Sequence, residues 1–286
     1  MRNYFRESSG ELCSMKAISP FYAIFVALAF FMPGPANGQS RDAGADPGGH
    51  TNRGVQFARN KEYAKAVTEF SKAIETQPND PKNYSNCALA YKLMHKMDEA
   101  RADFTKVIEL SPKSAEGYAG RGDVELAQNR IDDAIKDLDK AVSISPDDKT
   151  ARRLRGYAYL QKQDWNKAIE DYTKLIEQDP SDDQAYERRG FAYRSLKKYN
   201  EAVGDFTKVI DRRPQDPEVY RRRAFAYIQL NDNQKAESDL RTVLKLKPGD
   251  TDADARLKYL EQKASTSASP SSTPMRYPSP ATGSKP

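Results

Sequence analysis

The chain has 286 residues, of which 38% are hydrophobic and 30% are charged. This lean apolar content argues against one compact globular core and suits stacked amphipathic helices that each bury a single stripe. The formal net charge of +5 falls short of the concentrated basic face of a nucleic-acid binder. Only two cysteines occur, Cys13 and Cys87, which excludes a framework of disulfides.

The N-terminal segment contains an apolar run, FYAIFVALAFFM, from Phe21 to Met32. Lys16 precedes the run, and the small-residue pattern Ala36-Asn37-Gly38 follows it, as in a secretory signal peptide. Residues 1–38 are therefore predicted to be a signal peptide, and the mature protein is expected in the periplasm or outside the cell. The run is shorter than the about 20 apolar residues of a membrane span, so we expect no stable transmembrane span after processing. An uncleaved membrane anchor is the alternative.

Both ends of the chain are expected to lie outside the fold. Glu7 and Glu11 are unusual in a leader, whereas Met15 stands directly before Lys16 and the apolar run, so translation from Met15 is the alternative to Met1. Residues 39–46 are predicted to be a polar spacer. Residues 264–286, rich in Pro and Ser, contain too few apolar residues to offset the entropy of ordering them, and we predict a disordered tail.

Between these ends, four residue types recur with a period of 34 residues. Prolines occupy one position: Pro78, Pro112, Pro146, Pro180, Pro214 and Pro248. Alanines occupy a second: Ala66, Ala100, Ala134, Ala168, Ala202 and Ala236. A large side chain follows each alanine by four residues: Phe70, Phe104, Leu138, Tyr172, Phe206 and Leu240. Small residues occupy a fourth position: Gly54, Ala88, Gly122, Gly156, Gly190 and Ala224.

These spacings predict two amphipathic helices in each unit. A spacing of four residues puts two side chains on one helix face, and small residues let two helix backbones approach. Each proline ends the second helix of its unit. We expect the next unit to begin with an N-cap at Asp80, Ser114, Asp148, Asp182 or Asp216.

In this pattern the chain resembles the tetratricopeptide repeat (TPR) family, whose 34-residue unit has small residues at places 8 and 20 and proline at place 32. The resemblance implies an all-α, right-handed superhelical solenoid of six TPR helix-turn-helix repeats, at residues 47–80, 81–114, 115–148, 149–182, 183–216 and 217–250. Residues 251–263 contain Ala255, Leu257 and Leu260 among charges, and they are expected to form a C-terminal capping helix.

The seventh place of the repeat departs from the family pattern, which has a large apolar residue there. Five copies carry arginine: Arg53, Arg121, Arg155, Arg189 and Arg223. We expect their aliphatic stems to pack while the guanidinium groups reach solvent. The second copy has Cys87 at this place, and we expect it to pack as a small apolar residue.

The sequence offers few groups for catalysis. The sequence has two histidines, His50 and His95, and their spacing is not that of metal ligands. His95 is expected in a turn between helices. Trp165 is expected to pack at a turn, and no Gly-rich phosphate loop is present. We predict no catalytic residue, no metal ligand and no cofactor.

In the family, the first helix of each repeat lines the concave surface, so its ninth place supplies a column of side chains. That column consists of Val55, Leu89, Asp123, Tyr157, Phe191 and Phe225. Arginines flank its last three members: Arg153, Arg188, Arg194, Arg221 and Arg222.

From this composition we predict a basic, aromatic-lined groove in repeats four to six. It would bind an acidic extended peptide or a C-terminal carboxylate through arginine contacts and stacking. The alternative is a solvated charged face with packing aromatics. Some family members clamp a C-terminal carboxylate with Lys, Asn and Arg. The matching places here hold Arg153, Tyr157, Arg188, Glu218 and Arg222, so only the charge character is shared.

The expected function is that of a non-catalytic scaffold or adaptor that binds protein or peptide partners in the cell envelope or outside the cell. An accessory or substrate-presenting subunit of an envelope enzyme or assembly complex is the alternative. RNA binding would explain the arginines, but an exported protein rarely meets nucleic acid, so no nucleic-acid partner is expected.

Overall fold

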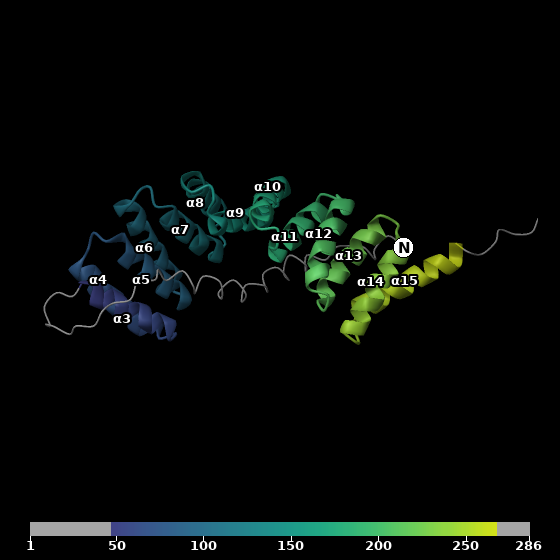
Figure 1. The fold of residues 1–286 in the computed structure, drawn as a ribbon, viewed down its shortest axis with the longest axis horizontal. Coiled ribbons are helices and arrows are strands. Elements are labelled where there is room, and N and C mark those ends of the chain that lie inside the picture. Colours follow the sequence, from purple (N-terminus) through teal and green to yellow (C-terminus); the bar gives the residue numbers. More distant parts are fainter. Residues whose placement is uncertain (1–46, 268–286) are drawn as a thin grey trace, which may run out of the picture. The chain divides into compact units, whose positions relative to one another are not determined.

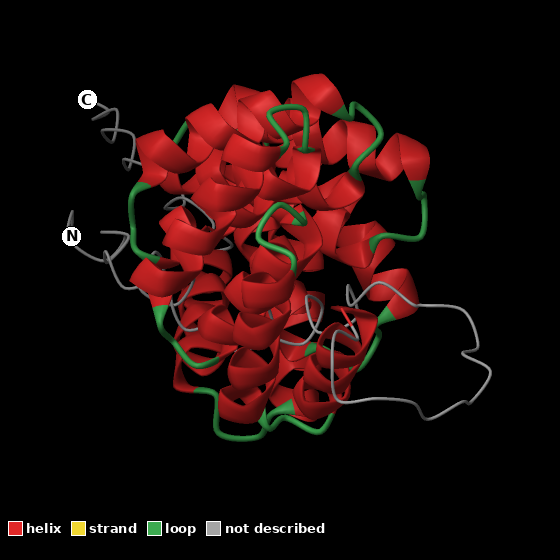
Figure 2. Ribbon diagram, turned by 90° about the vertical axis from the view of Figure 1, so that its left-hand side faces the viewer, coloured by secondary structure: helices red, strands yellow, loops and turns green. Residues whose placement is uncertain are grey.

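The computed structural model describes residues 47–267, and this part of the chain is built from helices and loops without a strand (Figure 2). The predicted signal peptide, the spacer and residues 268–286 of the tail lie outside the described residues. Among residues 47–267, no helix combines the length and the apolar character needed to cross a membrane. The predicted all-α class is confirmed.

The described residues divide into two compact units, of which unit 1 ends at Pro180 and unit 2 begins at Ser181. In unit 1, each helix packs against the next one along the chain, and the first helices of the copies also contact one another, α3 with α5, α5 with α7 and α7 with α9 (Figure 1). The helices of unit 1 are α3 Pro47–Arg59, α4 Tyr63–Thr76, α5 Pro81–Leu93, α6 Met97–Leu110, α7 Ala115–Ala127, α8 Ile131–Ile144, α9 Lys149–Lys162 and α10 Trp165–Gln178. This stacking of antiparallel pairs is typical of tetratricopeptide repeats.

Unit 2 has the same arrangement, in which each helix packs against its neighbour in sequence. Its helices are α11 Asp183–Ser195, α12 Tyr199–Arg212, α13 Pro217–Gln229, α14 Asn233–Leu246 and α15 Thr251–Ser267. The last helix is longer than the expected segment 251–263. Leu257 and Leu260 are buried in the cluster around α14, but Ala253, and not Ala255, shares their face. Ala253 lies four residues before Leu257, and Leu260 lies three residues after it, so all three side chains are on one side of the helix.

The first helices of copies two to six begin at side-chain N-caps, as predicted. A carboxylate oxygen of Asp148 accepts hydrogen bonds from the backbone N–H groups of Thr150 at 2.8 Å and Ala151 at 3.1 Å. The same role falls to Asp80, Ser114, Asp182 and Asp216.

The turn inside each copy has one residue in the left-handed region, with φ between 58° and 63°. These residues recur every 34 positions: Lys61, His95, Asn129, Gln163, Lys197 and Asn231. The predicted turn position of His95 is confirmed.

The recurring small and large residues meet in the core. All six members of the large-residue column are buried, and so are the six alanines four residues before them. A Cβ atom added at Gly190 would lie 2.9 Å from Cε1 of Phe206, closer than carbon atoms normally approach. The small residue therefore makes room for the ring, as the spacing predicted.

The structure corrects the prediction that the guanidinium groups of the seventh-place arginines reach solvent. Their guanidinium groups do not simply reach solvent, because four of them form two-pronged ion pairs with a buried aspartate 16 residues later, on the second helix of the same copy. The pairs are Arg121–Asp137, Arg155–Asp171, Arg189–Asp205 and Arg223–Asp239. In the first copy, Arg53 donates to Glu69 at 2.8 Å.

The second copy lacks this pair. Cys87 stands where the other copies have arginine, and it is buried, as predicted for a small apolar residue. Burial raises the pKa of its thiol, so the cysteine is a poor nucleophile. Asp103 keeps the place of the paired aspartates, and burial raises its pKa to about 6, against the smaller opposing effect of a hydrogen bond with Cys87.

Candidate binding site

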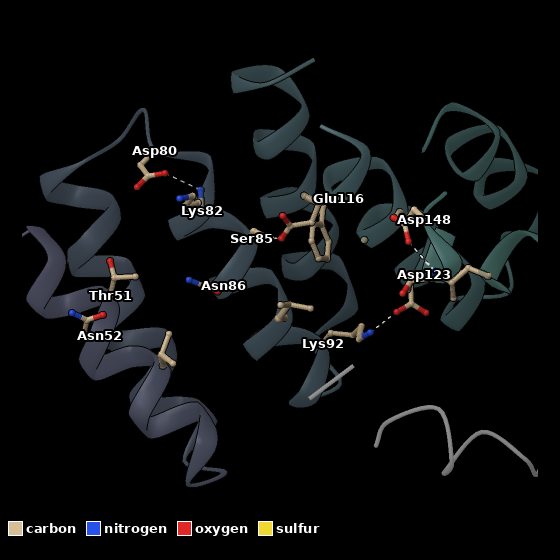
Figure 3. A pocket seen from close by; sticks show the side chains of 17 residues that line it. Thr51, Asn52, Asp80, Lys82, Ser85, Asn86, Lys92, Glu116, Asp123 and Asp148 are labelled. Atoms are coloured by element: carbon tan, nitrogen blue, oxygen red, sulfur yellow. Dashed lines mark hydrogen bonds and ion pairs between the residues drawn. The ribbon is translucent and has the colours of Figure 1, made fainter. Parts of the chain in front are cut away.

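The described part of unit 1 contains a cleft of about 610 Å³ (Figure 3). Most of its lining comes from α3, α5, α7 and α9, the first helices of copies one to four. The volume lies within the range of about 300 to 1,000 Å³ found for small-ligand sites. The same places of successive copies line it, because side chains three or four residues apart share one face of a helix.

Apolar side chains form the floor of the cleft. Val55, Leu154 and Phe104 are buried, and Leu89 is partly exposed. Phe104 belongs to the second helix α6 and reaches the floor beneath Gly120. A Cβ atom at Gly120 would lie 2.3 Å from Cε1 of the Phe104 ring, so only glycine allows this approach.

Short polar side chains from α3 and α5 contribute to the lining (Figure 3). Thr51 donates to the side-chain oxygen of Asn83 at 2.8 Å, and Ser85 donates to the carboxylate of Glu116. The amides of Asn52 and Asn86 also line the cleft, and neither makes a hydrogen bond to the described residues. An amide offers both donors and an acceptor, which is the pairing that a peptide backbone requires.

Carboxylates also line the cleft, on α7 and at the start of α9. Asp123 on α7 forms an ion pair with Lys92 of α5, and the two side chains are only 15% and 14% exposed. Glu116 stands at the start of the same helix, and Asp148 caps α9. In the view of Figure 3, Asp123 and Asp148 lie on the side away from Thr51 and Asn52. The lining of the cleft therefore combines the amides of Asn52 and Asn86 with several carboxylates.

The arginines and aromatics predicted as a site lie partly in unit 2. There the guanidinium group of Arg194 lies 5.1 Å from the ring centre of Phe191 and 5.2 Å from that of Phe225. Arg194 is 9% exposed and Arg188 is 8% exposed. The structure thus brings Arg194, Phe191 and Phe225 together as a stacked cluster with little free guanidinium surface.

Two further predicted arginines in unit 2 are paired with acidic side chains of that unit. Arg221 contacts Asp250 and Glu218, and Arg222 contacts Glu187 and Glu218. Burial opposes the charge of Glu187, but the guanidinium groups of Arg222 and Arg213 outweigh that effect and lower the pKa of its carboxyl. An acidic ligand at Arg222 would have to compete with these carboxylates.

The other two predicted residues, Arg153 and Tyr157, belong to α9 of unit 1. Gln161 donates a hydrogen bond of 2.8 Å to the hydroxyl oxygen of Tyr157. In residues 47–267, no three His, Cys, Asp or Glu side chains are grouped so that they could hold a metal ion.

The sequence did not point to the cleft of copies one to four. Its ninth-place column contained Val55, Leu89 and Asp123, but arginines and aromatics directed the prediction to the later copies. The available signal was the pair of short polar residues repeated at the fifth and sixth places: Thr51, Asn52, Ser85 and Asn86.

Two family models, both described as tetratricopeptide repeat, match the chain. The first matches residues 88–149, 120–183 and 153–217, and the second matches residues 193–261. None of the curated protein sequences compared with the chain matches it.

Solved structures share the fold at low identity. The chain is 21% identical to YrrB, described as a TPR protein with an unusual peptide-binding site. That match has a TM-score of 0.62 and covers 66% of this chain and 97% of YrrB. It is 20% identical to a tetratricopeptide repeat protein from Parabacteroides merdae, with a TM-score of 0.59 and coverage of 77% and 86%. It is 24% identical to MamA from Desulfovibrio magneticus, with a TM-score of 0.56 and coverage of 61% and 99%.

These matches agree with the helix pairs, the buried columns and the 34-residue period described above. Repeats of this kind generally serve as non-catalytic scaffolds that bind proteins or peptides. The chain belongs to the tetratricopeptide repeat family.

Proposed function

We propose that the chain is a non-catalytic scaffold that binds an extended segment of a partner protein in the cleft of unit 1. The observation that carries this proposal is the cleft itself, which combines an apolar floor with polar side chains around it. The floor suits an apolar side chain of the partner, and the amides of Asn52 and Asn86 suit its backbone. Most of the binding free energy is expected from the floor, and the polar side chains around it are expected to fix orientation.

A displayed library of random nonapeptides tests the proposal. The full-length chain is compared with an Asn86→Trp variant, in which a large neutral side chain fills the cleft. We expect the wild-type chain to enrich a family of related sequences that the variant does not retain. An Asn60→Trp variant, with the change at an exposed position that does not line the cleft, is the matched control. Circular dichroism confirms that each variant is folded, and equal enrichment by all three proteins would refute the proposal.

Phe191, Arg222 and Phe225 are partly exposed, and we propose a second binding surface there, in unit 2. We retain the prediction from sequence that arginine and aromatic side chains there bind an acidic peptide or a C-terminal carboxylate. The test compares a fluorescent acidic peptide that has a free C-terminus with its amidated form. Binding to the wild-type chain should weaken in an Arg222→Gln variant and should not change in Arg241→Gln, whose partner Glu261 is exposed. Equal binding by both variants would rule out Arg222 as a contact.

The predicted leader supports export, and we propose that the scaffold works in the cell envelope or outside the cell. N-terminal sequencing of the protein from fractionated cells tests this location. A mature start at Gln39 in the exported fraction would support it, and an uncleaved chain would support the membrane anchor. Stable co-purification with an active enzyme would favour the alternative of an accessory or substrate-presenting subunit.

A further inference from the structure

The cleft of unit 1 has an uneven distribution of charge. Four carboxylates line it, on Asp80, Glu116, Asp123 and Asp148, against the ammonium groups of Lys82 and Lys92. Lys92 is occupied by Asp123, since the two form a largely buried ion pair. Glu116 and Asp148 form no ion pair with any described residue.

The two unpaired carboxylates keep acceptor capacity toward the cleft. Glu116 receives one hydrogen bond, from the hydroxyl of Ser85. Asp148 uses a single oxygen, Oδ1, for both backbone N–H groups that it caps, which leaves Oδ2 without a partner in the described residues. An ionised carboxylate can accept several hydrogen bonds, so both groups can still bind a cationic donor.

An apolar surface lies beside these carboxylates. Leu154 and Ala119 line the cleft on the same helices that carry Asp148 and Glu116. A lysine or arginine side chain matches this combination, because its aliphatic stem packs on apolar surface while its charged end reaches a carboxylate. A carboxylate-bearing segment would instead meet like charge in a partly buried site.

We infer that the cleft of unit 1 selects a partner segment that has a lysine or arginine next to an apolar residue. This inference rests on the proposed function and adds the chemistry of the partner. It also sets the cleft apart from the arginine-rich surface of unit 2, which would take the opposite charge. One chain would then hold two partner segments of unlike charge.

The test uses the nonapeptide library with a charge-neutral variant of the cleft. Glu116→Gln and Asp148→Asn are combined, because glutamine keeps the size of glutamate and asparagine still serves as an N-cap. The control is Asp132→Asn, which removes a carboxylate from an exposed ion pair with Lys162 outside the cleft. Circular dichroism and thermal melting establish that the three proteins are equally folded.

We expect peptides enriched by the wild-type chain to contain Lys or Arg at least tenfold more often than Asp or Glu at one position. This preference should fall below about threefold in the double variant and persist in the control. The most enriched peptide is then resynthesised with Lys, Met or Glu at that position. Fluorescence anisotropy should give the lowest Kd for Lys, with a preference that weakens at high salt.

The outcomes separate this inference from the proposed function. If peptides bind and Asn86→Trp abolishes binding, but no preference for Lys or Arg appears, the charge inference is wrong and the cleft remains a peptide site. If no enrichment depends on the cleft, both proposals fail. Light scattering measures whether the chain forms a dimer. A dimer that the Asn86→Trp substitution dissociates would show that a second copy occupies the cleft, and it would overturn the inference.

Discussion

The guanidinium group of Arg223 donates to both carboxylate oxygens of Asp239, with distances of 2.9 Å from Nε to Oδ2 and 2.8 Å from Nη2 to Oδ1. Its third nitrogen, Nη1, donates to the hydroxyl of Thr207 in the preceding copy at 3.0 Å. Asp239 is only 5% exposed. One arginine therefore joins the two helices of its own copy to the second helix of the copy before it.

Removal of this arginine should be costly. Arg223→Met leaves the carboxylate of Asp239 buried without its partner, and we expect a loss of about 3 to 5 kcal/mol in the free energy of unfolding. Urea denaturation measures the loss. Arg241→Met, which breaks an exposed ion pair with Glu261, should cost less than about 1 kcal/mol. Arg223→Met combined with Asp239→Leu should recover most of the loss, and a double variant as unstable as the single one would contradict this account.

Cys87→Arg should supply the partner that Asp103 lacks. The pKa of Asp103 is about 6 in the folded chain and 3.8 for an ordinary aspartate, so the folded chain binds this proton more tightly than the unfolded chain. Ionisation of Asp103 therefore reduces stability as the pH rises from about 4 to 6. The variant should be more stable than wild type at pH 7, and the gain should fade near pH 4.

Thermal melting across this pH range checks the prediction. Cys87→Ala serves as the control, because it removes the thiol and supplies no positive charge. A Cys87→Arg variant that is destabilised equally at pH 4 and pH 7 would show that the second copy has no room for the pair.

Glu125 occupies a place where the other copies have an aromatic residue: Phe57, Tyr91, Tyr159, Tyr193 and Tyr227. It is 2% exposed, and its Oε2 atom has no hydrogen-bond partner among residues 47–267. Burial and then the charge of Asp137 raise the pKa of Glu125, so the charged form destabilises the folded chain once the pH exceeds the ordinary range for glutamate. Glu125→Gln should stabilise the chain by about 1 kcal/mol at neutral pH and by less in acid. Chemical denaturation at neutral and at acidic pH measures this gain in stability. A loss of stability at neutral pH would contradict the prediction.

Gly190→Leu should overpack the contact with Phe206 and destabilise unit 2 by about 1 to 3 kcal/mol. Gly204 provides a matched control in the same unit, because a Cβ atom there would meet nothing within 4 Å. Gly204→Ala should raise stability by about 0.5 to 1 kcal/mol, since glycine is a poor residue inside a helix. Melting curves that are unchanged by Gly190→Leu would count against the packing of the small residue on the ring.

The fold was largely predictable because each residue type that recurs in the repeat has one local structural effect. Proline at Pro180 ends a helix, Asp182 caps the next one, and Gly190 leaves room for Phe206. The arginine pairs were missed although their signal was present. An acidic residue recurs every 34 positions from Glu69 to Asp239, but the side chains that pair are 16 residues apart across a turn. Helical periodicity connects residues three or four apart and says nothing about such partners.

The cleft was harder to predict. Its shape depends on how α3, α5, α7 and α9 are spaced, and its lining changes from copy to copy, as from Asn86 to Gly120 to Leu154. Periodicity shows which face of a helix packs inward, but it does not show where neighbouring helices leave a cleft. The arginine and aromatic residues of the sequence favoured the later copies, where Arg221 and Arg222 are paired with neighbouring acids.

The left-handed residues in the six turns have a practical consequence. A residue with a Cβ atom pays roughly 1 to 2 kcal/mol for this conformation, less for asparagine, whereas glycine adopts it freely. None of the six lines the cleft. Heat tolerance could therefore be adjusted step by step at the turns of a protein whose recognition chemistry is left untouched. The six turn residues therefore influence the melting temperature without contributing to the lining of the cleft.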